Sequence, residues 1–132
     1  MKKLLYKITC LTTLFALIYS CADVERVYYN DSAETFLSLS DDNLVLNEDS
    51  ATNEILTLTW TEPDFGFSAA ALYSVQIDVQ GGDFSNPQII SVGASFDKTF
   101  TVEELNAKLL SLSMSPNEDG VASFRIKATL SE

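Results

Sequence analysis

The amino-acid sequence predicts an all-β domain, an antiparallel sandwich of short strands with one short helix. Apolar and polar residues alternate over short segments such as residues 54–60, a pattern typical of strands with one buried face. Turn-forming glycine, proline, asparagine and aspartate separate these segments. A single stretch after Thr101 has helical periodicity instead, so that one helix is expected among the strands.

Six segments are predicted as strands, at residues 43–46, 54–60, 71–80, 88–92, 98–100 and 121–130. In the second of these, Leu56, Leu58 and Trp60 share one face, which predicts Trp60 as a core residue rather than a ligand-binding surface residue. In the last, the apolar side chains at alternate positions from Ala122 to Leu130 are expected to point inward.

Sandwiches of the immunoglobulin or fibronectin type III kind have about seven strands, one more than the six predicted. Either the sandwich lacks its last strand, after residues 121–130, or a further strand lies at residues 35–39, which also alternate. We expect a sandwich at residues 39–132 that is truncated at its C-terminus.

The helix is predicted at about residues 102–112. Thr101 followed three residues later by Glu104 is the pattern of a capping box, in which each side chain bonds to the other residue's backbone N–H. Leu105, Leu109 and Leu112 then form one apolar stripe at helical spacing.

The first 20 residues have the features of a bacterial lipoprotein signal. Lys2 and Lys3 precede a short apolar run, and the small residue Ser20 stands directly before Cys21. Cleavage before Cys21 would leave its thiol to carry the lipid anchor, and residues 21–38 read as a polar tether. The alternative is an ordinary cleaved signal in which the cysteine occurs by chance.

Charge and composition restrict the function. The chain carries a net charge of −11, which becomes about −14 once the basic signal is removed, and such a surface argues against nucleic-acid partners. It has no histidine, which removes Ser-His-Asp and Cys-His catalysis and most zinc sites. We therefore expect no enzyme, no catalytic or metal-binding residues and no cofactor, with calcium binding by a loop left as an alternative.

Two short motifs resemble parts of nucleotide-processing sites. Asp64-Phe65-Gly66 matches a kinase tripeptide, and Gly81-Gly82-Asp83 matches part of a cyclase signature. Neither has the rest of its motif, so both are predicted as turns.

The segment from Leu56 to Phe67 resembles the start of the N-terminal domain of the SusE family. The similarity continues through the segments at residues 73–78, 84–87, 101–112 and 124–128, and covers roughly residues 36–132 after the lipoprotein signal. SusE-like proteins are surface lipoproteins of Bacteroidetes starch-utilisation systems. They bind α-glucan beside a porin-like SusC transporter and a SusD-like lipoprotein, through domains that follow the N-terminal one.

The resemblance implies a lipid-anchored protein of the outer membrane, displayed on the cell surface. Its sandwich would be a non-catalytic spacer for glycan-binding modules absent from this chain, so that glycan-binding residues here are unknown. The alternative is an autonomous interaction module that docks on an outer-membrane transporter complex. A small hydrolase is a third and weaker alternative.

Asp31-Ser32-Ala33 and Asp49-Ser50-Ala51 resemble an O-glycosylation pattern of the same bacteria. This resemblance makes Ser32 and Ser50 candidate modification sites.

Overall fold

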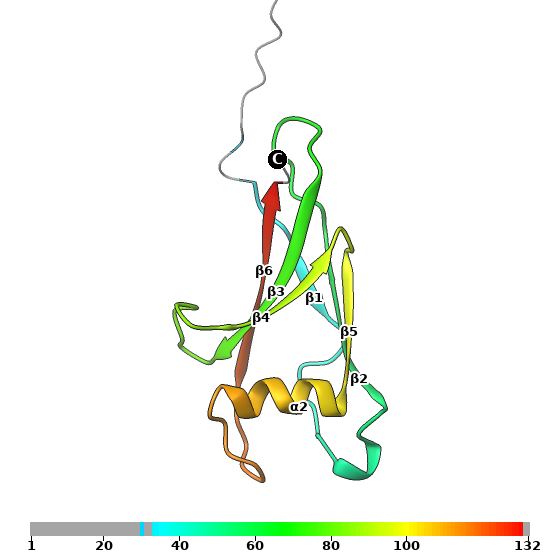
Figure 1. Ribbon diagram of the computed structural model, residues 1–132, viewed down its shortest axis with the longest axis vertical. Helices are drawn as coiled ribbons and strands as arrows, with labels where there is room; N and C mark the ends of the chain where they lie inside the picture. Colours follow the sequence, from blue (N-terminus) through cyan, green and yellow to red (C-terminus); the bar gives the residue numbers. More distant parts are fainter. Residues whose placement is uncertain (1–29, 31–32, 131–132) are drawn as a thin grey trace, which may run out of the picture.

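The computed structural model describes residue 30 and residues 33–130. Its six strands form two three-stranded antiparallel sheets (Figure 1). The first sheet has the order β1-β2-β5 and consists of Leu37–Leu39, Glu54–Trp60 and Asp97–Thr101. The second sheet has the order β4-β3-β6 and consists of Gln88–Gly93, Ala71–Val79 and Ala122–Leu130.

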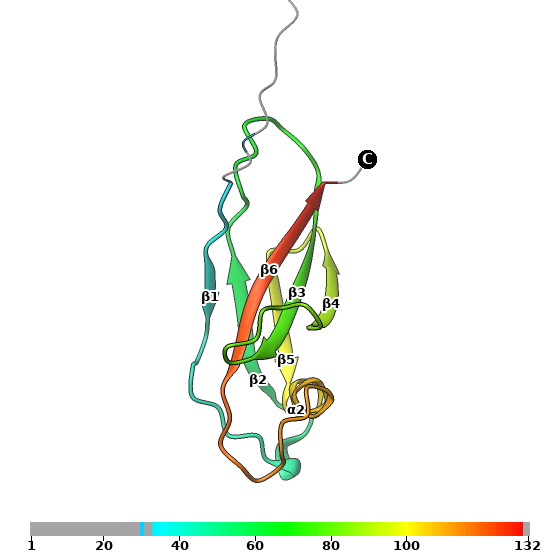
Figure 2. The ribbon, with the colours of Figure 1, turned by 90° about the vertical axis from the view of Figure 1, so that its left-hand side faces the viewer.

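The core lies between the inward faces of the two sheets, whose strands run along the long axis of the domain (Figure 2). Most of its buried side chains come from the central strand of each sheet: Leu56, Leu58 and Trp60 from β2, and Tyr73, Val75 and Ile77 from β3. Phe100 of β5 and Leu105 of the helix add to them. Alternate residues supply this core because a strand turns successive side chains to opposite faces. The predicted antiparallel sandwich and the buried Trp60 are confirmed.

The first strand is not the one that was expected. Residues 43–46 have no strand pairing, whereas Leu37–Leu39 pairs with β2 in the register Leu37↔Trp60 and Leu39↔Leu58. Leu44 and Leu46 still pack partly against the core. The alternation in residues 43–46 therefore reflects packing beside the core and not strand pairing, since β1 and β5 already occupy both sides of β2.

The helix α2 spans Val102–Ser111 and lies across one end of the sandwich (Figure 1). Leu105 is fully buried, and Leu109 and Leu112 pack against the core from the predicted stripe. The N–H groups of Val102 and Glu103 donate to the carbonyls of Asn53 and Ala51, which follow the 3₁₀ turn η2 (Glu48–Ser50). These two bonds satisfy N–H groups that a helix start leaves unpaired, and they fix the helix to the loop before β2.

Strand β6 pairs with β3 over nine consecutive residues without a register shift, from Ala71↔Leu130 to Val79↔Ala122. Its inward residues Phe124, Ile126, Ala128 and Leu130 pack against the core as predicted. On its other side, no strand of the described part of the chain pairs with it.

Candidate functional site

The predicted lipid anchor Cys21 lies outside the described residues, as does Ser32, so both stay predictions. The backbone N–H of Asn30 donates to the carbonyl of Phe65 at 2.9 Å, and its side-chain amide donates to the carbonyl of Asp64 at 2.8 Å. The chain therefore enters the domain at the loop between β2 and β3, at the end opposite α2 (Figure 1).

An aromatic cluster joins the buried Trp60 and Tyr73 to Phe96, which lies directly before β5 and is 42% exposed. The ring centroids of Trp60 and Tyr73 are 6.0 Å apart, and those of Tyr73 and Phe96 are 5.3 Å apart. Trp60 is only 5% exposed and Tyr73 only 3%, so neither ring offers a face on which a sugar could stack. Burial raises the pKa of the Tyr73 hydroxyl above its usual 10.0, and the Glu62 carboxylate adds to the rise.

The surface is hollowed at the loop between β2 and β3, in a pocket of about 530 Å³. It is lined by residues 62–69 of that loop alone. Within it, the Gly66 N–H donates to Asp64 Oδ1 at 2.8 Å, which closes the predicted turn. A pocket made by one loop brings no polar groups together from separate elements, unlike a typical ligand site.

A polar cluster on the outer face of the second sheet was not predicted from the sequence. Asp78 is only 9% exposed, and its carboxylate accepts the N–H of Val79 and the N–H of Phe84, both at 2.8 Å. These bonds fold the loop between β3 and β4 back onto the sheet. We call this arrangement the Asp78 latch.

Two features of the loop backbone allow the Asp78 latch to form. Phe84 has a φ of 56°, a left-handed conformation that bulky residues rarely adopt, and the bond to Asp78 holds it there. A Cβ added at Gly82 would lie 2.4 Å from Asp78 Oδ2, so only glycine leaves room for the carboxylate. The Gly81-Gly82-Asp83 turn is therefore confirmed, and its role is to clear space for Asp78.

Arg125 of β6 completes the cluster. Its Nε donates to Gln76 Oε1 at 2.6 Å, and its guanidinium lies 4.2 Å from the centre of the Phe84 ring. Gln76 is 4% exposed although it lies on the outer face of the sheet. The arginine and the folded loop cover it, which no local sequence pattern reveals. Hydrogen bonds from Ser85 lower the pKa of the neighbouring, exposed Asp83 carboxyl.

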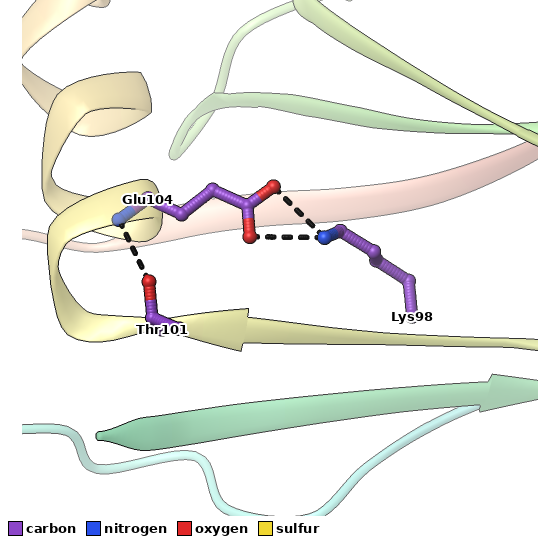
Figure 3. A network of polar contacts seen from close by, with 3 residues as sticks. All are labelled: Lys98, Thr101 and Glu104. Carbon is purple, nitrogen blue, oxygen red and sulfur yellow. Dashed lines mark hydrogen bonds and ion pairs between the residues drawn. The ribbon is translucent and has the colours of Figure 1, made fainter. Parts of the chain in front are cut away.

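The capping box at α2 is only half present (Figure 3). The Glu104 N–H donates to Thr101 Oγ1 at 3.2 Å, as predicted. The Glu104 carboxylate does not reach back to Thr101, and instead forms an ion pair with Lys98, with Nζ 2.8 Å from Oε1 and 2.9 Å from Oε2. Lys98 sits on the inner face of β5, opposite Leu58, and its ammonium lies 4.8 Å from the centre of the Phe100 ring.

The remaining acidic residues do not form a centre. In residues 30 and 33–130, no group of three or more Cys, Asp and Glu side chains lies close enough to hold a metal ion. Ser50 lies in η2, where its hydroxyl donates to the carbonyl of Asn47 at 2.9 Å. Within the same residues, no helix is long and apolar enough to cross a membrane.

Comparison with known protein families gives a match. The family model described as "SusE outer membrane protein" matches residues 22–127, most of the chain. Neither the comparison with curated proteins nor the comparison with solved structures gives a match.

Proposed function

Because the chain belongs to the SusE outer membrane protein family, we propose that it is a lipid-anchored surface protein of a glycan-utilisation system. Family membership makes it an outer membrane protein of the starch-utilisation type. In this proposal Cys21 carries the lipid, and the sandwich is a non-catalytic spacer that holds glycan-binding modules of the same system near SusC- and SusD-like proteins.

The observation that carries the proposal is the extent of the family match, which begins at residue 22, directly after the proposed lipidated cysteine. Asn30 lies nine positions after Cys21, and an extended chain spans roughly 3.3–3.6 Å per residue. The loop between β2 and β3 would therefore lie within about 30 Å of the membrane surface, with α2 at the far end of the domain.

The sandwich itself supports a spacer role over a binding role. Its only tryptophan is buried in the core, and the hollow at residues 62–69 belongs to a single loop. Sugar-binding sites commonly present an exposed aromatic face for stacking beside polar groups from several elements. Binding of α-glucan is accordingly assigned to further domains and not to this sandwich.

Lipidation is tested by Cys21→Ser in cells fed a fatty-acid probe. The wild-type chain should be labelled and recovered with the outer membrane, and the variant should be unlabelled. Equal labelling of the two chains would refute the anchor. Protease treatment of intact cells then tests display, because a surface domain should be digested and a periplasmic one protected.

The spacer role is tested separately, by electrophoresis of the purified chain through gels with and without starch. Unchanged mobility is expected. Retardation by starch would show a binding site in this chain and contradict the role, whatever the outcome for Cys21.

The second candidate function is an autonomous interaction module. It is favoured by one observation: among the described residues, β6 pairs with β3 on one side and with no strand on the other.

A further inference from the structure

Strand β4 forms one edge of the second sheet, and neither it nor the turns beside it carry a charge. Residues 84–96 contain no Asp, Glu, Lys or Arg, in a chain in which 20% of the residues are charged. Charged residues on an edge strand hinder its pairing with another chain. The next strand, β5, has such a residue in the inward-facing Lys98, and β4 has none.

The free side of β4 leaves apolar side chains only partly covered. Ile90 lies opposite Val75 in register, yet Val75 is fully buried and Ile90 only half-buried. Val92 also packs against the core and is half-buried, and on the outer face Ile89 is 59% exposed. In the described part of the chain, β3 is the only strand that pairs with β4, and it separates β4 from β6. A strand added to this edge would cover these side chains and pair with the free backbone groups.

The sequence of β4 is complementary to itself. In an antiparallel pair of two β4 strands with the two-fold axis at Ile90, this residue faces its own copy, Ile89 faces Ser91, and Gln88 faces Val92. Facing residues of an antiparallel pair lie on the same side of the sheet, so inner residues meet inner residues and outer ones meet outer ones. The register brings no charged residue of β4 opposite another.

The lack of charge favours a second copy of the chain over a charged segment of another protein. Charged partners are recognised by complementary charge, which β4 does not offer. Two copies of an acidic chain repel each other, and an uncharged edge keeps that repulsion away from the contact.

The contact is short, which makes the pairing weak. Pro87 precedes β4, and its register with β3 shifts after Ser91. A small interface of this kind holds two molecules together chiefly where their local concentration is high, as between proteins anchored in one membrane.

We propose that two copies of this chain associate through antiparallel pairing of their β4 strands. The pairing joins the three-stranded second sheets of the two copies into one continuous sheet of six strands. This goes beyond the spacer function and does not depend on it.

The first test is sedimentation equilibrium of the full chain, in detergent matched to the density of the buffer. A monomer–dimer equilibrium should appear at concentrations up to about 1 mM, and it should shift towards dimer as NaCl screens the repulsion between acidic copies. A chain that stays monomeric over this range overturns the proposal.

Two double variants on the outer face test the register without touching the core. Ile89→Lys with Ser91→Glu creates two facing Lys–Glu pairs in the dimer, and Ile89→Lys with Ser91→Lys creates two facing Lys–Lys pairs. The first should dimerise at least about tenfold more tightly than the second. The Lys–Lys variant is the less acidic of the two, so a general repulsion between copies would give the opposite order. Equal or reversed affinities contradict the proposal.

Disulfide cross-linking locates the contact. Ile90→Cys places a thiol on the two-fold axis, where facing Cα atoms lie about 4.5–5.5 Å apart, within the range that a disulfide spans. Mild oxidation should convert this variant to a covalent dimer. Ala128→Cys is the matched control, an inward position on the edge strand β6, and should stay monomeric. Cross-linking of the control alone, or of both variants equally, would place the contact elsewhere and overturn the proposal.

Discussion

Strands β5 and β6 are edge strands of opposite sheets, and they differ in length and in the residues that they carry on their inner faces. β5 is five residues long, leads directly into α2, and carries Lys98 on its inner face with Glu104 as its ion-pair partner. β6 is nine residues long and carries only apolar residues on its inner face. The first edge is therefore closed by a charge and the second remains suited to pairing.

The contrast shows that whether an edge strand can pair with another strand depends on which face its charged residues occupy, and not only on their presence. β6 has two cations, but both project outward, and Arg125 turns towards Gln76 and Phe84 on the outer face of the sheet. β5 has one cation, and it stands where an added strand would need an apolar side chain.

The largest expected effect is a difference in folding stability between alanine variants of two isoleucines in the second sheet. Ile77→Ala on the fully buried central strand should lower the free energy of unfolding by about 2–5 kcal/mol, through lost burial and a cavity. Ile126→Ala removes the same atoms from the half-buried edge strand and should cost only about 1–2 kcal/mol. Urea denaturation of the two variants measures the difference. Equal losses would mean that β6 is covered as completely as β3, and the contrast between the edges would fail.

The Asp78 latch provides the next largest effect. Asp78→Ala leaves the N–H groups of Val79 and Phe84 without their acceptor and should cost about 1–3 kcal/mol. Asp78→Asn keeps one side-chain oxygen and should cost less. Thermal melts of the two variants provide the measurement. A loss confined to the loop, seen as faster amide exchange at Phe84 with an unchanged melting temperature, would show that the latch does not support the sheet beside β6.

Thr101→Ala tests the N-terminal cap of α2, which directly follows β5. It removes the hydroxyl that accepts the Glu104 N–H and should cost about 1 kcal/mol. Thr101→Ser retains the acceptor and serves as the matched control in the same urea titrations. If the serine and alanine variants are equally destabilised, the hydroxyl does not cap the helix.

The smallest effect concerns the ion pair that closes β5. Glu104→Gln should cost no more than about 0.5 kcal/mol, because both partners are partly exposed and the pair is screened by water and salt. The cost should shrink further at 1 M NaCl. A loss above that of Thr101→Ala would indicate that the carboxylate completes the capping box in solution, contrary to the structure.

Much of the architecture could be predicted because its causes are local. Alternation locates β2 and β3, and the Thr101 hydroxyl together with the leucine stripe locates α2. Pairing was harder to predict, since residues 43–46 alternate like a strand but only pack beside the core. β1 was retained only as an alternative, because three residues carry little periodic signal.

The polar contacts were the least predictable, because they join residues far apart in the sequence. Arg125 and Gln76 meet only through the pairing of β6 with β3, and Phe84 reaches Asp78 only through the fold of one loop. Gly81 and Gly82, three and four residues after Asp78, were the available sequence signal for the latch. Cys21, the proposed anchor, remains a prediction from the signal sequence alone.

Residue-specific amide hydrogen exchange in the full chain tests the open edge of β6 most directly. In an antiparallel edge strand, N–H groups that bond to the neighbouring strand alternate with groups that point away from it. Amides from Ala122 to Leu130 should therefore alternate between slow and fast exchange, while those of the central strand β3 should all be slow. Uniformly slow exchange along β6 would mean that its free side is already paired, and would contradict the account.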